Sequence, residues 1–207
     1  NNPEKGLKIV HVAGTNGKGT VCAIIESVLR HSGLRTGLYT SPHLINFNER
    51  IRVNGKCIPD VDLAALIKDI EREAKTLTKD SKGREVTFFE FATALAFEYF
   101  KRQKIDIAII ETGMGGRLDA TNVITPLLSV ITGISMEHTQ WLGNDIQSIT
   151  REKCGIIKPG IPLIIGQLPE EVLCTITAIA NKLNCPVIHS EKVVSIQRKS
   201  QDLTGQQ

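Results

Sequence analysis

Short apolar runs alternate with segments of helical periodicity along almost the whole chain. The spacing of the apolar residues predicts strands in the runs and helices in the segments between them. The predicted strands cover residues 7–13, 36–40, 105–110, 127–134, 162–165 and 186–189, and the predicted helices cover residues 21–31, 61–77, 88–100, 145–154 and 169–183. This alternation is typical of an α/β fold with a doubly wound, mostly parallel sheet. In such sheets, ligands bind beyond the carboxyl ends of the strands.

Local signals sharpen three parts of this pattern. Asn54 and Gly55 lie between two short apolar runs and predict a β-hairpin within residues 41–60. That segment is then a small structured excursion, typical of a loop that covers a ligand. Thr87 and Glu90 form a capping box ahead of the helix at 88–100. The largely apolar residues 193–196 indicate the start of one more strand.

A glycine-rich turn lies between the first predicted strand and the first predicted helix. It consists of Gly14, Thr15, Asn16, Gly17, Lys18, Gly19 and Thr20. Glycines let backbone N–H groups approach an anion, the helix start adds unpaired N–H groups, and Lys18 supplies a positive charge for the outer phosphates of a nucleotide. Gly19 stands where the usual P-loop has a serine or threonine that holds magnesium, so part of the metal coordination is expected from elsewhere in the chain. A turn that serves only chain geometry is the alternative.

Three polar residues lie at or just beyond the ends of other predicted strands. Ser41 follows the second strand, Glu111 closes the third, and His138 lies past the fourth. Because these strand ends meet at one edge of a parallel sheet, we expect a magnesium or manganese site beside the phosphates. Each residue also has a structural alternative. Ser41 could cap a turn, Glu111 could pair with Arg117 or Lys18, and His138 could be a hydrogen-bonded core histidine.

A second glycine-rich segment, residues 112–122, follows Glu111 directly. It fits the G-x-G-x-x-G pattern poorly, because the spacing fails and no helix clearly begins there. We interpret it as a loop that brings backbone close to a substrate, with Arg117 and Asp119 as its polar groups. A plain connecting loop is the alternative.

Composition and charge narrow the function classes further. The 207 residues fit one large domain or an incomplete part of a larger protein. A net charge of +3 without a run of lysine or arginine gives no support for nucleic-acid binding. The five cysteines form no C-x-x-C pair, which favours reduced thiols. Since no signal peptide and no membrane-length apolar run is apparent, we expect a cytoplasmic protein that does not bind membranes. We also expect its partners to be small molecules and the protein to be a monomer.

Read together, the motifs resemble the folylpolyglutamate synthase / dihydrofolate synthase family, a branch of the Mur ligases. The resemblance extends from about residue 9 to residue 165 and rests on the segments 14–20, 40–44, 47–52, 111–122, 137–139 and 153–158. It implies an ATP-dependent ligase. ATP phosphorylates a carboxylate of dihydropteroate or of a folate, and the amine of L-glutamate then attacks the acyl phosphate.

The resemblance also implies roles for individual residues. Residues 14–20 would bind the triphosphate of ATP, Ser41 and Glu111 would bind Mg²⁺, and His138 would bind a second Mg²⁺. Lys153 matches a lysine that is carbamylated in this family, where the added carboxylate supports the second metal. Lys18, Lys153 and His138 are therefore the expected catalytic residues. Pro42, His43, Arg117 and Asp119 are the expected contacts of the acid substrate.

The extent of the resemblance predicts a single ATP-binding domain over residues 1–207, truncated at both ends. The glutamate-binding C-terminal domain of the family would be absent, and the chain alone would be inactive. Two alternatives stay open. One is a Mur ligase of peptidoglycan synthesis, and the other is a non-catalytic P-loop nucleotide-binding module.

Overall fold

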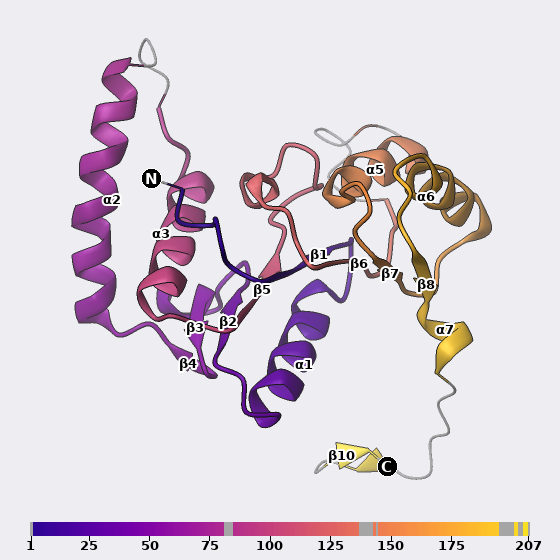
Figure 1. The fold of residues 1–207 in the computed structure, drawn as a ribbon, viewed down its shortest axis with the longest axis horizontal. Coiled ribbons are helices and arrows are strands. Elements are labelled where there is room, and N and C mark those ends of the chain that lie inside the picture. Colours follow the sequence, from indigo (N-terminus) through magenta and orange to yellow (C-terminus); the bar gives the residue numbers. More distant parts are fainter. Residues whose placement is uncertain are drawn as a thin grey trace.

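A mostly parallel sheet of eight strands forms the centre of the molecule, with helices on both of its faces (Figure 1). The computed structural model describes residues 2–80, 85–136, 143, 145–194, 201–202 and 205–206. Across the sheet the strands are β4 (Lys56–Cys57), β3 (Ile51–Val53), β2 (Thr36–Tyr39), β5 (Ile107–Glu111), β1 (Ile9–Ala13), β6 (Leu128–Ile131), β7 (Leu163–Ile165) and β8 (Val187–His189). The predicted α/β fold class is confirmed.

Six of the eight strands are joined by parallel pairing, and β3 and β4 form the antiparallel hairpin predicted at Asn54 and Gly55. After β1 the chain crosses to β2, returns to place β5 between them, and continues on the other side of β1 with β6. The order of the strands therefore reverses at β1. In parallel sheets this reversal opens a crevice beyond the carboxyl ends of the strands.

The helices differ in length and in the face of the sheet that they cover. They are α1 (Lys18–His31), α2 (Asp60–Asp80), α3 (Phe88–Arg102), α5 (Ile146–Lys153), α6 (Glu170–Lys182) and α7 (Ser190–Val193), with 3-10 turns η1 (Phe47–Arg50), η2 (Ala120–Val123) and η3 (Cys154–Ile156). A small ribbon pairs β9 (Gln201–Asp202) with β10 (Gly205–Gln206). Within the described residues, no helix has both the length and the apolar character that a membrane span requires.

Successive core residues of each strand point to opposite faces of the sheet, as the period of two in a β-strand requires. Val10 and Val12 of β1 pack under α1, while Ile9 and Ala13 face the opposite side, where α2 and α3 cover one half of the sheet and α5 and α6 the other. The same alternation places Ile109 on the α1 face and Ile110 on the opposite face. Glu111 shares the parity of Ile109, so its side chain points towards the start of α1.

The prediction of a strand over residues 193–196 is wrong at Val193. Val193 ends the short helix α7, and Val194 is its C-cap. Residues 195 and 196 lie outside the described residues. The capping box at Thr87 is confirmed, since the Thr87 hydroxyl accepts the N–H of Glu90 and the Glu90 carboxylate accepts the N–H of Thr87.

Candidate functional site

The P-loop (residues 14–20) links the carboxyl end of β1 to the amino end of α1. Gly17 has φ +81° and caps the helix. The first intrahelical bond runs from the N–H of Val21 to the carbonyl of Gly17. The preceding amides of the helix have no intrahelical acceptor because helix geometry leaves the first turn unpaired. These donors and the positive end of the helix dipole suit an anion.

Gly14 is required at its position for two reasons. Its φ of +153° is a conformation that L side chains rarely adopt, and an added Cβ would lie 1.9 Å from the hydroxyl of Thr132. The segment after β6 also supports the loop from one side, because Thr15 donates its N–H to the carbonyl of Gly133 and the Thr132 hydroxyl donates to the carbonyl of Asn16. The P-loop is thus held in shape by the neighbouring strand β6.

Two lysines from distant parts of the chain meet at the carbonyl of Gly14. Lys18 Nζ donates to this oxygen over 2.9 Å and also to the carbonyl of Thr15 over 3.1 Å. Lys153 Nζ, buried at the end of α5, donates to the same Gly14 oxygen over 2.9 Å. The two ammonium groups are therefore within two hydrogen-bond lengths of each other. Only the family resemblance indicated Lys153, since its local sequence is that of an ordinary helix lysine.

Glu111 lies beneath the P-loop with its carboxylate almost fully buried. Its two oxygens lie 3.7 and 3.8 Å from the place where Gly19 would carry a Cβ, which is ordinary van der Waals contact, so the acid lies directly against the start of α1. The backbone N–H of Ser41 donates to Glu111 Oε2 over 3.0 Å. Burial raises the pKa of Glu111, and the bond from Ser41 and the charge of Lys18 oppose this rise.

This arrangement confirms that the ends of β1, β2 and β5 bring Lys18, Ser41 and Glu111 together. It also answers one of the two structural alternatives for Glu111, since Arg117 pairs with Glu152 instead. A buried carboxylate that faces the P-loop, bonded to the backbone of a serine, is of the oxygen-ligand type that Mg²⁺ prefers. Within the described residues no trio of His, Cys, Asp or Glu side chains is grouped for metal binding. His138, the expected ligand of a second metal, lies outside the described residues.

In the second glycine-rich loop (residues 112–122), one side chain of the loop accepts hydrogen bonds from several of its backbone amides. Asp119 Oδ2 accepts the N–H groups of Gly113 and Met114, each over 2.9 Å, and Oδ1 accepts the N–H and the hydroxyl of Thr121. The Asp119 carboxylate therefore shapes the loop from inside. The sequence suggested only an outward role for this residue.

The same loop is packed closely against α5 and η3. A Cβ on Gly116 would lie 2.7 Å from the carbonyl oxygen of Lys153, and one on Gly155 would lie 2.2 Å from the Cα of Arg117. Arg117 extends outwards and pairs with Glu152 at 2.9 Å. Because Lys153 belongs to the same short helix, this packing ties the second loop to the lysine that contacts the P-loop.

The excursion after β2 begins with a cis peptide bond between Ser41 and Pro42 and carries a small aromatic cluster. Arg50 is buried and donates from Nε to His43 Nδ1 over 2.8 Å, while its guanidinium lies 5.4 Å from the ring centre of Phe88. The Glu49 carboxylate accepts the N–H groups of residues 44, 45 and 46, which lowers the pKa of Glu49 to about 2. His43 is therefore held by Arg50 on a loop whose first residue, Ser41, bonds to Glu111.

The sequence analysis did not single out His11, which is fully buried in β1. Its Nε2 lies 2.8 Å from the hydroxyl of Thr121, so β1 contacts the second loop as well as the P-loop. Burial lowers the pKa of His11 to about 3, and the charge of Lys158 adds to this effect. A polar residue in the middle of an otherwise apolar strand was the available signal.

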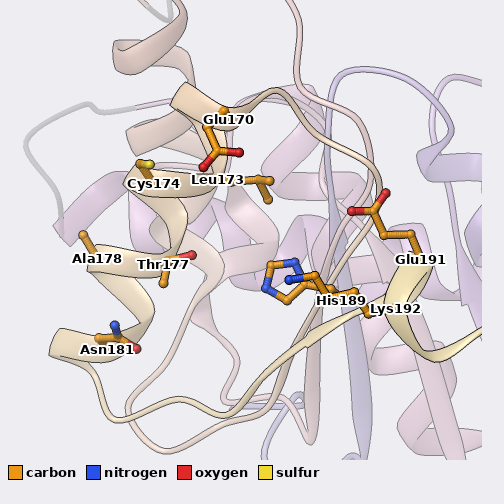
Figure 2. A pocket seen from close by; sticks show the side chains of 9 residues that line it. All are labelled: Glu170, Leu173, Cys174, Thr177, Ala178, Asn181, His189, Glu191 and Lys192. Atoms are coloured by element: carbon orange, nitrogen blue, oxygen red, sulfur yellow. The ribbon is translucent and has the colours of Figure 1, made fainter.

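A cavity of about 600 Å³ lies away from these loops, between α6 and the segment formed by β8 and α7 (Figure 2). Its lining residues are Glu170, Leu173, Cys174, Thr177, Ala178, Asn181, His189, Glu191 and Lys192. Since β8 is the edge strand and β1 lies three strands away, this cavity does not belong to the P-loop site.

Comparison with known proteins agrees with this geometry. The sequence matches the Mur ligase middle domain over residues 12–190. The chain belongs to this family. It is 46% identical over 186 residues to the dihydrofolate synthase/folylpolyglutamate synthase of Bacillus subtilis, covering 89% of this chain and 43% of the relative. The chain spans less than half the length of the curated relatives that it matches first.

Solved structures agree with this Mur ligase domain over nearly its whole length. The folylpolyglutamate synthase of Mycobacterium tuberculosis, complexed with ADP and AMPPCP, superposes with a TM-score of 0.92 at 34% identity, covering 97% of this chain and 47% of that protein. An FPGS-AMPPCP-folate complex superposes with a TM-score of 0.90 at 36% identity, covering 99% of this chain and 52% of that one. The likeness includes both the fold and the sequence.

Proposed function

We propose that this Mur ligase domain is the ATP-binding part of a longer ligase that joins L-glutamate to dihydropteroate, to folate, or to both. The observation that carries the proposal is the convergence of the P-loop, Ser41 and Glu111 at the ends of three neighbouring strands. The named activity of the relatives and the ATP analogue and folate in a similar structure support it. Residues 1–207 would act together with a further glutamate-binding domain.

The reaction needs a carboxylate to become an electrophile. A carboxylate oxygen of the acid substrate attacks the γ-phosphorus of ATP, the bond to the β-γ bridging oxygen breaks, and ADP leaves. The amine of glutamate then attacks the acyl carbon, inorganic phosphate leaves with its bonding electrons, and the amine nitrogen loses a proton. Catalysis of this kind depends mainly on positioning and on neutralising phosphate charge.

The residues of the P-loop suit the first step. The unpaired amides at the start of α1 would bind the β- and γ-phosphates. Lys18, which donates to carbonyls of its own loop in the structure, would turn its ammonium group to the phosphate oxygens. Glu111 and Ser41 would hold Mg²⁺, which would neutralise phosphate charge when bound. Glu111 fits this role because a cation compensates a carboxylate that is otherwise buried with one backbone donor.

Lys153 and His138 belong to the finer part of the proposal. Lys153 Nζ reaches the P-loop carbonyl of Gly14, so a carbamate on this nitrogen would place an added carboxylate near the phosphates. His138, which follows β6 in the sequence, would be the ligand of the second metal. The family resemblance is the basis of both roles.

The acid substrate would lie between the two remaining loops. Residues 41–50 offer His43 and Pro42 next to Arg50 and Phe88, and the second loop lies immediately beyond Glu111. The exposed side chains of Met114 and Leu118 belong to this second loop. Arg117 and Asp119 would act here, Asp119 by holding the loop amides and Arg117 by its reach towards solvent.

A direct assay tests the proposal. The complete protein is expected to release ADP from ATP only when L-glutamate and either dihydropteroate or tetrahydrofolate are present. Comparison of the two acids would separate the two activities, and a nucleotide-linked muropeptide offered in parallel would detect a Mur ligase of peptidoglycan synthesis. ADP release independent of glutamate, or none at all, would contradict the proposal. We further propose that the complete protein is a monomer, which its sedimentation would test, and that it is cytoplasmic, which cell fractionation would test.

A further inference from the structure

A chain of hydrogen bonds runs from β1 into the second glycine-rich loop. His11 Nε2 contacts the Thr121 hydroxyl over 2.8 Å, the Thr121 hydroxyl donates to Asp119 Oδ1, and Asp119 Oδ2 accepts the amides of Gly113 and Met114. All the interior members of this chain are buried or part-buried. A residue of the P-loop strand is thereby connected to the first two amides after Thr112.

The direction of each bond follows from the number of hydrogens available. A threonine hydroxyl has one hydrogen, and here it is directed to the carboxylate of Asp119. The Thr121 oxygen can then only accept from His11, so His11 must carry its hydrogen on Nε2. In a neutral imidazole this leaves Nδ1 as an acceptor. Among the described residues, His11 Nδ1 is a buried atom without a hydrogen-bond partner.

These facts exclude an acid–base role for His11. The ring is fully buried, its Nε2–H is committed to Thr121, and its Nδ1 faces the protein interior. Burial also keeps the ring neutral, since the pKa of His11 is lowered to about 3. What remains for the imidazole is to fix the orientation of the Thr121 hydroxyl.

We propose that His11 is a positioning residue of the acid-substrate site, acting through Thr121 and Asp119 on the amides of Gly113 and Met114. This inference rests on the proposed function, because the second loop is assigned there to the acid substrate. We call this chain of hydrogen bonds, from His11 to the Gly113 and Met114 amides, the relay. The relay fixes the second loop at the point where it leaves β5, directly after Glu111. The P-loop shares β1 with His11 but has its own supports, at Thr132, Gly133 and Lys153.

The test compares two valine substitutions in the complete protein. Thr121→Val keeps the shape of the side chain and removes the relay hydroxyl. Thr36→Val is the matched control, because the Thr36 hydroxyl is also buried and also donates to a carboxylate, that of Glu26, but at the amino end of β2, away from the loops at the carboxyl ends of the strands. Thr121→Val is expected to raise the KM for the acid substrate about tenfold and to leave the KM for ATP within twofold of wild type. Thr36→Val is expected to change neither KM.

Further variants separate positioning from a general loss of stability. Thr121→Ser keeps the hydroxyl and is expected to restore the KM for the acid substrate. His11→Leu is expected to match Thr121→Val, and the double variant is expected to be no worse than either single one, because both interrupt one relay. Equal changes in both KM values, additive effects, or failure of Thr121→Ser to restore the KM would overturn the inference.

Two measurements do not depend on turnover. In ¹⁵N-histidine spectra of the complete protein, His11 is expected as the Nε2–H tautomer at neutral pH. In hydrogen exchange, Thr121→Val is expected to speed the exchange of the Gly113 and Met114 amides at least tenfold, and Thr36→Val to leave it unchanged. An Nδ1–H tautomer or unchanged exchange would overturn the relay. A wild-type protein that ligates no glutamate would overturn the proposed function, and these two measurements would still decide the relay.

Discussion

The two glycine-rich loops look alike in the sequence and use their backbones in opposite ways. In the P-loop, lysine side chains bind backbone carbonyls, with Lys18 and Lys153 both on Gly14, and within the described residues the amides at the start of α1 stay available. In the second loop, the Asp119 carboxylate binds backbone amides. One loop is therefore held by cations and offers donors to an anion. The other is held by an internal anion and has already used several of its donors.

This difference shows that glycine content alone does not identify a phosphate site. The decisive property is which backbone groups remain without an internal partner. Asp119 occupies in its own loop the kind of position that a bound anion would take in the P-loop. The second loop is consequently better suited to present side chains and carbonyls to a substrate than to hold a phosphate.

The largest effect is expected from a substitution in the P-loop. Lys18→Ala removes the mobile charge proposed to bind the outer phosphates and is expected to lower kcat/KM of the complete protein at least about 100-fold. Glutamate-dependent ADP release measures this. Lys182→Ala, an exposed lysine on α6, is the matched control and should retain full turnover. Unchanged turnover of Lys18→Ala would remove this lysine from the mechanism.

Glu111→Gln is expected to separate activity from stability. The substitution keeps an oxygen for the Ser41 amide but loses the charge proposed to bind the metal, so turnover should fall about 100-fold. Because burial raises the pKa of Glu111, the ionised acid destabilises the folded protein above that pKa, and wild-type stability rises as the pH falls through it. In EDTA at pH 7.5, urea denaturation should show the variant to be more stable than wild type.

The control for this experiment is Glu170→Gln, which removes an exposed acid from the first turn of α6. It is expected to leave turnover unchanged and to give no gain in stability. A Glu111→Gln protein that is active, or one that is less stable than wild type, would contradict the assignment of Glu111 as a buried metal ligand.

Asp119→Asn tests the role of the Asp119 carboxylate in the second loop. An asparagine has one acceptor oxygen and places an NH₂ group against amides that need an acceptor, which should cost about 1–3 kcal/mol of unfolding free energy. The KM for the acid substrate should rise about tenfold, while the affinity for ATP stays unchanged. Isothermal titration with an ATP analogue, alongside steady-state kinetics, measures both. A loss of ATP affinity equal to the rise in the KM would show that the two loops are not separate in function.

His11 is expected to make the stability of the protein depend on pH. It belongs to β1, which leads into the P-loop and contacts the second loop. The pKa of His11 is lowered from 6.5 to about 3, so between these values the unfolded chain binds the extra proton and the folded protein does not. Wild-type stability should therefore fall as the pH drops from about 6.5 towards 3, by at most ~1.4 kcal/mol per pH unit from this group. Urea denaturation of His11→Gln should show a shallower fall.

The smallest effect is expected at the Arg117–Glu152 pair, which joins the second loop to α5. The Arg117 side chain is 57% exposed and that of Glu152 is 24% exposed, so solvent screens their attraction. A double-mutant cycle with alanine should give a coupling free energy below about 1 kcal/mol. A much larger coupling would mean that this surface contact, more than the glycine packing beneath it, holds the second loop against the helix that carries Lys153.

The amino-acid sequence was sufficient for the local and periodic features of this protein. Apolar spacing predicted the strands and helices, Asn54 and Gly55 predicted the hairpin, and the order of strands and helices predicted the parallel sheet with Lys18, Ser41 and Glu111 at its carboxyl edge. These features depend on residues close together in the chain or on the general rule for parallel sheets. The expected strand at Val193 failed because a short apolar run can also end a helix.

Only the tertiary structure decided which groups satisfy one another. That Lys153 reaches Gly14, that His11 reaches Thr121, and that Asp119 turns inwards all depend on contacts between side chains and backbone that no spacing rule contains. Two of these contacts join residues more than 100 positions apart. Most buried polar groups are hydrogen-bonded, and the packing of the whole domain decides which partner each of them meets.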